Sequence, residues 1–288
     1  MAQILRILKY CFGLVLLFAS TSHANDSALA IVGGGVQSSE DAPFVSTGYQ
    51  FLPGDYIYVT FRIAGFAVQA DEEKELRAIS LTYALSPVDS SEIALAEPSS
   101  GEIKTRLSNE DKNWIPTRRA SFLLPSFVAA GEFHIHLVVR DLIGKSEATK
   151  DFPFRMGGVR LEHSDLLAIE NLRFSRDESG QEPLQVPAYR PGDTVYCNFD
   201  MAGFKLEGKK YHVAYGVNVR RPDGKPFLDE PNAAQMSDSA YYPPQFVPGS
   251  LNVITSAKSP KGMYTLLLTV RDMVGNTSAV ASRAFTLE

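Results

Sequence analysis

The chain repeats itself, and this internal repeat constrains the fold more than any other feature of the sequence. When the sequence is shifted by 138 positions, two well-separated segments match without a gap. Leu29-Ala30-Ile31 falls on Leu167-Ala168-Ile169, and Pro53-Gly54-Asp55 falls on Pro191-Gly192-Asp193. Tyr58, Phe61 and Ala64-Gly65-Phe66 meet Tyr196, Phe199 and Ala202-Gly203-Phe204 in the same register. One register across both segments indicates a duplicated domain.

The shift between the copies changes in small steps further along the chain. Tyr83 matches Tyr215 at 132 positions, and near the end Phe154 matches Phe285 at 131. Between them, Asp111-x-x-Trp114-x-Pro116 matches Asp238-x-x-Tyr241-x-Pro243 at 127. Surface loops tolerate insertions, so such steps are typical of loops that differ in length between two copies of one domain. The copies run from residue 29 to 156 and from residue 167 to 288.

The first 24 residues have the pattern of an export signal. Arg6 and Lys9 precede an apolar run from Cys11 to Ala19, and Ser22-His23-Ala24 places small residues where a signal peptidase cleaves. The run is shorter than the roughly 20 residues that span a bilayer, so we favour a cleaved signal over a retained anchor. We therefore predict a periplasmic or secreted protein with no transmembrane segment after cleavage. Its expected domains are residues 25–157 and 158–288, with 158–166 as the linker.

Alternating apolar residues predict strands in both copies. Ile57, Val59, Phe61 and Ile63 alternate with more polar neighbours after the first Pro-Gly-Asp. The second copy repeats this pattern with Val195, Cys197, Phe199 and Met201. A period of two marks a strand with one buried face. The same alternation recurs at Phe133, Ile135, Leu137 and Val139, and at Tyr264, Leu266, Leu268 and Val270, each time followed by an Asp–Gly turn that signals a hairpin.

Short strands with Pro and Gly punctuation predict an all-β fold in which each copy is a two-sheet sandwich. Only residues 164–172 suggest a short helical turn. The segments 191–196 (PGDTVY) and 262–276 (GMYTLLLTVRDMVGN) resemble an early strand and the last hairpin of bacterial immunoglobulin-like and fibronectin-III-like domains. The resemblance implies two tandem immunoglobulin-like β-sandwich domains and carries no catalytic residue.

Charge and cysteine content narrow the function. The net charge of −5 argues against nucleic acid as a partner, because nonspecific binding to nucleic acid requires a basic face. Cys11 lies in the predicted signal, which leaves Cys197 as the one thiol of the mature chain. Cys197 matches Val59 on an apolar face, so we predict a buried, unpaired thiol rather than a nucleophile.

Glu132, His134 and His136 are the candidate metal ligands, since they share the outward face of one predicted strand. Side chains at alternate positions of a strand can bind one ion together. The second copy has Met263, Thr265 and Leu267 at these positions, so the fold does not require the histidines. The sequence alone favours a sheet face without a metal, and we expect no cofactor.

Aromatic residues next to proline give the candidate binding surface. Trp114, Tyr241 and Tyr242 lie in connecting segments of the two copies. Such rings can present a flat surface to a sugar or a peptide, or they can fold under the loop and close the end of a sandwich. We favour the second interpretation because both copies keep an aromatic residue there.

No catalytic motif stands out, so we expect a noncatalytic exported module that binds a protein or polysaccharide partner at the cell envelope or outside the cell. The alternative is an accessory or catalytic domain of a polysaccharide-processing system that uses Glu132, His134 and His136. Apolar residues in and after the linker predict a partly restrained pair of sandwiches: Val159, Leu161, Leu166 and Leu167.

Overall fold

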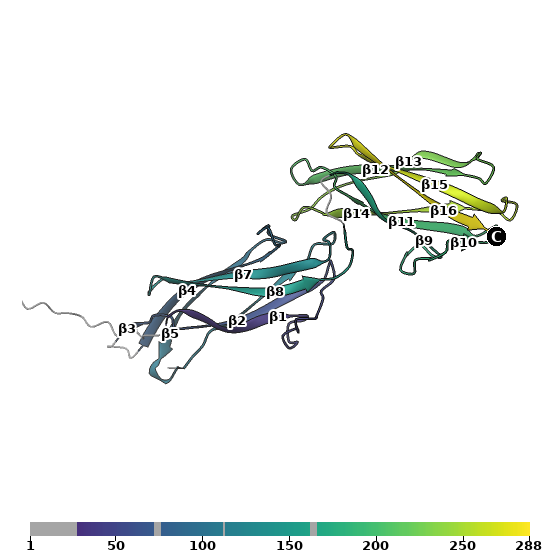
Figure 1. The fold of residues 1–288 in the computed structure, drawn as a ribbon. Coiled ribbons are helices and arrows are strands. Elements are labelled where there is room, and N and C mark those ends of the chain that lie inside the picture. The colour runs from purple at the N-terminus through teal and green to yellow at the C-terminus, as the bar shows by residue number, and fades with distance from the viewer. Residues whose placement is uncertain (1–27, 72–75, 112, 162–165) are drawn as a thin grey trace, which may run out of the picture.

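The structure is a computed structural model that describes residues 28–71, 76–111, 113–161 and 166–288. Strands dominate these residues, and the two sets of strands form two sandwiches that follow one another along the chain (Figure 1). The predicted signal peptide, residues 1–24, lies outside the described residues. Within the described part of the chain, no helix has the length and apolar character needed to cross a membrane.

The first sandwich packs a three-stranded sheet against a larger one. The smaller sheet has the order β1-β2-β6, and the larger sheet contains β3-β4-β7-β8 with β5 paired to β4. The strands are β1 (Ala30–Gln37), β2 (Tyr56–Ala64), β3 (Gln69–Asp71), β4 (Leu76–Val88), β5 (Ser99–Ser108), β6 (Thr117–Leu123), β7 (Gly131–Asp141) and β8 (Ser146–Met156). A short 3-10 turn, η2 (Asn109–Asp111), follows β5.

The second sandwich has the same strand order, apart from the short edge strands β3 and β10. Its sheets run β14-β11-β9 and β13-β12-β15-β16-β10. The strands are β9 (Ala168–Ser175), β10 (Ala188–Tyr189), β11 (Thr194–Ala202), β12 (Lys210–Arg220), β13 (Pro226–Ser239), β14 (Phe246–Ile254), β15 (Gly262–Asp272) and β16 (Thr277–Leu287). In the smaller sheets, β1-β2-β6 corresponds to β9-β11-β14. In the larger sheets, β5-β4-β7-β8 corresponds to β13-β12-β15-β16. This order is that of an immunoglobulin-like sandwich, so the predicted all-β fold of two such copies is confirmed.

Strand pairing confirms most of the register inferred from the repeat. Ala30 pairs with Ala64, and Ala168 pairs with Ala202. At the other end of the unit, Phe133 pairs with Phe154 and Tyr264 with Phe285. Tyr83 and Tyr215 also occupy equivalent places, because they face Val139 and Val270.

One predicted match is wrong. Pro116 accepts a backbone hydrogen bond from Ile63, whereas the equivalent of Ile63, Met201, pairs with Val247. Pro116 therefore corresponds to Val247, and Pro243 lies four residues before that position. Backbone hydrogen bonds between strands fix the register, whereas similar residue types in these loops do not define equivalent positions.

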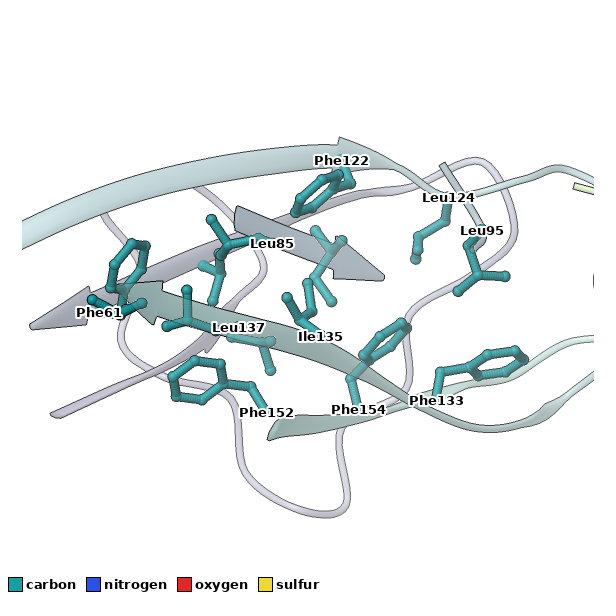
Figure 2. Packing of buried hydrophobic residues seen from close by; sticks show 14 of the residues in the cluster. Phe61, Leu85, Leu95, Phe122, Leu124, Phe133, Ile135, Leu137, Phe152 and Phe154 are labelled. Atoms are coloured by element: carbon teal, nitrogen blue, oxygen red, sulfur yellow. The ribbon is translucent and has the colours of Figure 1, made fainter. Parts of the chain in front are cut away.

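The predicted apolar faces form the two cores. Ile57, Val59, Phe61 and Ile63 are fully buried, as are Ile135, Leu137 and Val139 on the opposite sheet. Figure 2 shows Phe61, Ile135 and Leu137 of this set packed together in the interior of the first sandwich. Both copies contain the same edge-to-face aromatic pair across the core, with ring centroids 5.4 Å apart in Phe61–Tyr83 and 5.1 Å apart in Phe199–Tyr215.

A tyrosine in the second sandwich closes a corner in the way that is typical of immunoglobulin-like domains. Tyr264, near the start of β15, is fully buried, and its hydroxyl donates to the carbonyl of Pro260 at 2.8 Å. This contact ties the strand to the connection that precedes it. Phe133 occupies the equivalent position in the first sandwich.

Asp141 and Asp272 hold the last hairpin in both copies. Asp141 Oδ1 accepts from the backbone of Ile143 and Gly144, and its Oδ2 accepts from Ala67 at 2.6 Å. Asp272 makes the equivalent bonds to Val274 and Lys205. Buried carboxylates that accept backbone N–H groups organise turns, so this repeated feature is architectural.

The expected helical turn over residues 164–172 is wrong where the structure describes it. Ala168–Ser175 is strand β9, whose residues pair with β11 along the edge of the smaller sheet. Pairing with a neighbouring strand overrides the weak local preference for a helix.

Cys197 gives a test of the second core. The thiol is fully buried and unpaired, and burial raises the pKa of Cys197 to about 12. Because the thiolate is the reactive form, a Cys11→Ser chain should resist a thiol reagent at neutral pH and expose one reactive thiol after unfolding in urea. Rapid labelling of the folded chain would contradict the assigned core.

Candidate functional site

The two sandwiches meet through a tyrosine that crosses from one to the other. Tyr242, in the connection between β13 and β14, is only 3% exposed and belongs to the apolar core cluster of the first sandwich. Its hydroxyl donates to Asp89 Oδ2 at 2.8 Å. Asp89 Oδ1 accepts from the backbone N–H groups of Ser91 and Ile93, so the same carboxylate shapes the loop after β4.

Gln245 reinforces this inter-domain contact. Its backbone N–H donates to the carbonyl of Phe127 at 2.9 Å, and its side-chain oxygen accepts from the backbone of Ala129 at 2.7 Å. Its side-chain NH₂ also donates to the Tyr242 hydroxyl at 3.1 Å. A connection of the second sandwich thus satisfies backbone groups of the first, which fixes the relative position of the two loops.

The described residues at the two ends of the linker each contact a sandwich. The carbonyl of Val159 accepts from the backbone of Ala130 at 2.7 Å, which anchors the start of the linker to the first sandwich. Leu167 packs against the second core, while Leu166 is 76% exposed. Among the described residues, Tyr242 and Gln245 add a restraint that lies far from the linker in sequence.

A concave surface, which we call the inter-domain groove, lies beside this contact. It has a volume of about 450 Å³, and its walls come from the loops after β4 and β6 and from the β13–β14 connection. Tyr241 and Leu123 line it and are 42% and 52% exposed. The ammonium group of Lys209 lies 4.2 Å from the centre of the Tyr241 ring. Apolar lining with a few polar groups is characteristic of binding sites, and such sites are frequent between domains.

The structure separates the three aromatic candidates. Trp114 is partly buried and packs against the core of the first sandwich, which agrees with a ring that closes its own domain. Tyr242 is buried as well, but in the neighbouring sandwich. Of the three, Tyr241 is the exposed one, at 42%.

The structure brings two of the three candidate metal ligands together with a residue that the sequence analysis missed. Glu132 Oε1 accepts from Arg155 at 2.6 Å, while one ligand atom each of His134, His136 and Asp151 lie within 4.8 Å of one another. His136 Nδ1 lies 2.7 Å from Asp151 Oδ1, because these residues face each other across β7 and β8. The predicted hairpin turn at Asp141–Gly144 already implies this pairing, so the sequence contained the signal.

A second hollow lies on the open side of the second sandwich. Its volume is about 600 Å³, and it lies between the edge strands β13 and β14. Polar side chains such as Asn198, Glu230 and Asn232 line it, and Tyr215 spans it by donating to the carbonyl of Ser250 at 2.6 Å. That bond links a core strand of one sheet to the edge of the other.

Comparison with known proteins identifies no family for the chain: no family model and no curated protein matches it. Among solved structures, it is similar to the C-terminal domain of the Streptococcus agalactiae antigen I/II polypeptide BspA, with 12% identity and a TM-score of 0.27 over 88% of this chain and 100% of that one. The C-terminal domain of the Streptococcus pyogenes antigen I/II-family protein AspA matches with 10% identity and a TM-score of 0.28, over 89% and 100% of the two chains. Dimeric latent PorU from Porphyromonas gingivalis matches with 12% identity and a TM-score of 0.24, over 91% of this chain and 20% of that one. Scores this low carry no argument about function.

Replacing Tyr242 by Phe tests the inter-domain contact. The change keeps the ring but leaves Asp89 Oδ2 without its donor, and an unsatisfied buried acceptor costs about 1–3 kcal/mol. We expect the free energy of unfolding to fall by about that amount in urea titrations, while Tyr241→Phe has little effect. Equal effects of the two substitutions would contradict the contact.

The stability that the Tyr242 hydroxyl contributes should depend on pH. Burial, followed by the hydrogen bond and negative charge of Asp89, raises the pKa of Tyr242 above its ordinary value of 10.0. Because the pKa is raised in the folded state, the Tyr242 hydroxyl makes its full contribution to the free energy of unfolding below pH 10. That contribution is lost as the pH rises further. We expect the stability difference between the natural chain and Tyr242→Phe to shrink above pH 10.

Trp114 reports on the end of the first sandwich. Because its ring packs against the core, we expect its emission in the folded chain to be blue-shifted relative to the unfolded chain and protected from acrylamide. It is the single Trp of the chain, so the signal has one source. A red-shifted emission that acrylamide quenches readily would show that the ring is exposed.

Proposed function

We propose that the chain is a noncatalytic exported module that binds a protein partner in the inter-domain groove. The observation that carries this proposal is the pair Leu123 and Tyr241, two exposed apolar side chains from different sandwiches that line one groove. Export is inferred from the predicted signal over residues 1–24. The expected environment is the cell envelope or the cell exterior.

The groove is built to persist without a partner. Tyr242 and Gln245 fix the β13–β14 connection to loops of the first sandwich, and Tyr241 is the direct neighbour of Tyr242. A preorganised surface loses little conformational freedom on binding, which leaves more of the contact energy for affinity. The inter-domain contact therefore supports a binding role for the groove beyond its role in stability.

The chemistry of the walls favours a protein over a polysaccharide. Sugars stack on open aromatic faces and need many polar groups for their hydroxyls, whereas the walls of this groove include the exposed Leu123 and the half-buried Phe127. Lys209 also occupies one face of the Tyr241 ring. A partner that inserts apolar side chains next to the carboxylates of Glu97 and Asp238 fits these walls best.

The alternative function in polysaccharide processing gains no support from its candidate residues. The Glu132 carboxylate forms an ion pair with the guanidinium group of Arg155 and is therefore engaged away from the two histidines. No specific observation therefore favours a catalytic role.

Photo-crosslinking in the producing cell tests the proposal. A photoreactive residue at Leu123 should give a covalent adduct with a protein. Tyr241→Ala should reduce that adduct at least 10-fold, since truncating a Tyr at the centre of an interface often costs about 2 kcal/mol or more and about 1.4 kcal/mol is already tenfold. The matched control is the same photoreactive residue at Val280, which is 60% exposed on the second sandwich and does not line the groove.

Two results would overturn the proposal. One is an absence of adducts at Leu123, or equal adducts at Leu123 and Val280. The other is retention of the chain on cell-wall polysaccharide that Tyr241→Ala abolishes, which would assign the groove to a glycan.

A further inference from the structure

We propose that the outer face of β7 and β8 holds a Zn²⁺ site made by His134, His136 and Asp151. One ligand atom from each residue lies within 4.8 Å of the others, so small rotations of these side chains bring all three within reach of a single ion. This site belongs to the first sandwich alone and is independent of the inter-domain groove.

Sheet geometry creates the cluster. His134 and His136 are two positions apart on β7, so both imidazoles project from the same face. Asp151 lies opposite His136 on β8, and directly opposed side chains on antiparallel strands have neighbouring Cβ atoms. Two paired strands of a stable core therefore position three donors without help from a flexible loop.

The contacts between these side chains suit a cation. His136 Nδ1 and Asp151 Oδ1 are 2.7 Å apart, and a metal ion bound to both atoms can replace this hydrogen bond. His134 Nε2 lies 3.5 Å from Glu92 Oε1, so a second carboxylate adds negative charge next to the cluster. The side chains of His136 and Asp151 are 40% and 57% exposed, which leaves the site open to an ion from solvent.

The duplication argues that these residues are not needed for the fold. The second sandwich builds the same β-hairpin from β15 and β16, and it carries Thr265, Leu267 and Ser282 at the equivalent positions. A sheet face that folds equally well with Thr, Leu and Ser has no structural requirement for two imidazoles and a carboxylate. The difference between the copies therefore points to a ligand.

The donor set selects the metal. Two imidazole nitrogens and one carboxylate oxygen are a set that Zn²⁺ accepts, with its fourth position open to water. Ca²⁺ and Mg²⁺ prefer sites built from oxygen atoms alone, so they should compete poorly.

Isothermal titration of the full-length chain with ZnCl₂ at neutral pH tests the site. We expect one saturable site, an affinity at least 10-fold lower in His136→Ala and in Asp151→Asn, and a similar loss in His134→Ala. His212→Ala is the matched control, because His212 is a partly buried histidine on β12 of the second sandwich and lies outside the cluster. Excess CaCl₂ should leave the Zn²⁺ isotherm unchanged.

A second readout separates loss of binding from loss of folding. Saturating Zn²⁺ should raise the melting temperature of the natural chain and of His212→Ala but not that of His136→Ala, since a ligand stabilises only the state that binds it. The melting temperatures of the metal-free variants should match that of the natural chain, because these side chains lie on the outer face. Absence of saturable binding, or equal binding by His136→Ala and His212→Ala, would overturn the proposal.

Discussion

The arrangement of the two sandwiches depends on the burial of one tyrosine in its neighbour's core. Tyr242 loses almost all contact with water, and its hydroxyl must then find a partner, since a buried polar group without a hydrogen bond costs free energy. Asp89 supplies that partner and is itself held by backbone donors of its own loop. The bond therefore connects the shape of a first-sandwich loop to the position of the second sandwich.

This dependence explains why the groove lies where it does. The β13–β14 connection places Tyr242 inward, so the preceding residue, Tyr241, is left on the outside of the same turn with Lys209 over its ring. Gln245 then fastens the end of the connection to Phe127 and Ala129, in the loop that follows Leu123. The two walls of the groove are thus consequences of one packing event, and neither sandwich alone would contain both.

The sequence predicts the sandwiches better than it predicts their contact. Period-two alternation and the repeat identify the buried faces around Phe61 and Phe199, because a strand with one buried face leaves a pattern that is local in sequence. The bond between Tyr242 and Asp89 joins residues 153 positions apart and links the two copies to each other, so neither periodicity nor repetition reveals it. Similar residue types in the loops gave an incorrect alignment of the two copies, in which Pro116 was matched with Pro243.

The candidate sites follow the same division between local and distant information. Asp151 was within reach of sequence reasoning, because the turn after Asp141 fixes which residue of β8 faces His136. Leu123 and Lys209 were not, because only the fold brings them to Tyr241.

In a duplicated chain, positions that both copies keep, such as Asp141 and Asp272, report on architecture. Positions at which the copies differ in chemistry on an unchanged strand, such as His136 and Leu267, are free of that constraint. Function is therefore best sought where the copies diverge, which for this chain means the outer face of β7 and β8 and the connection that carries Tyr241 and Tyr242.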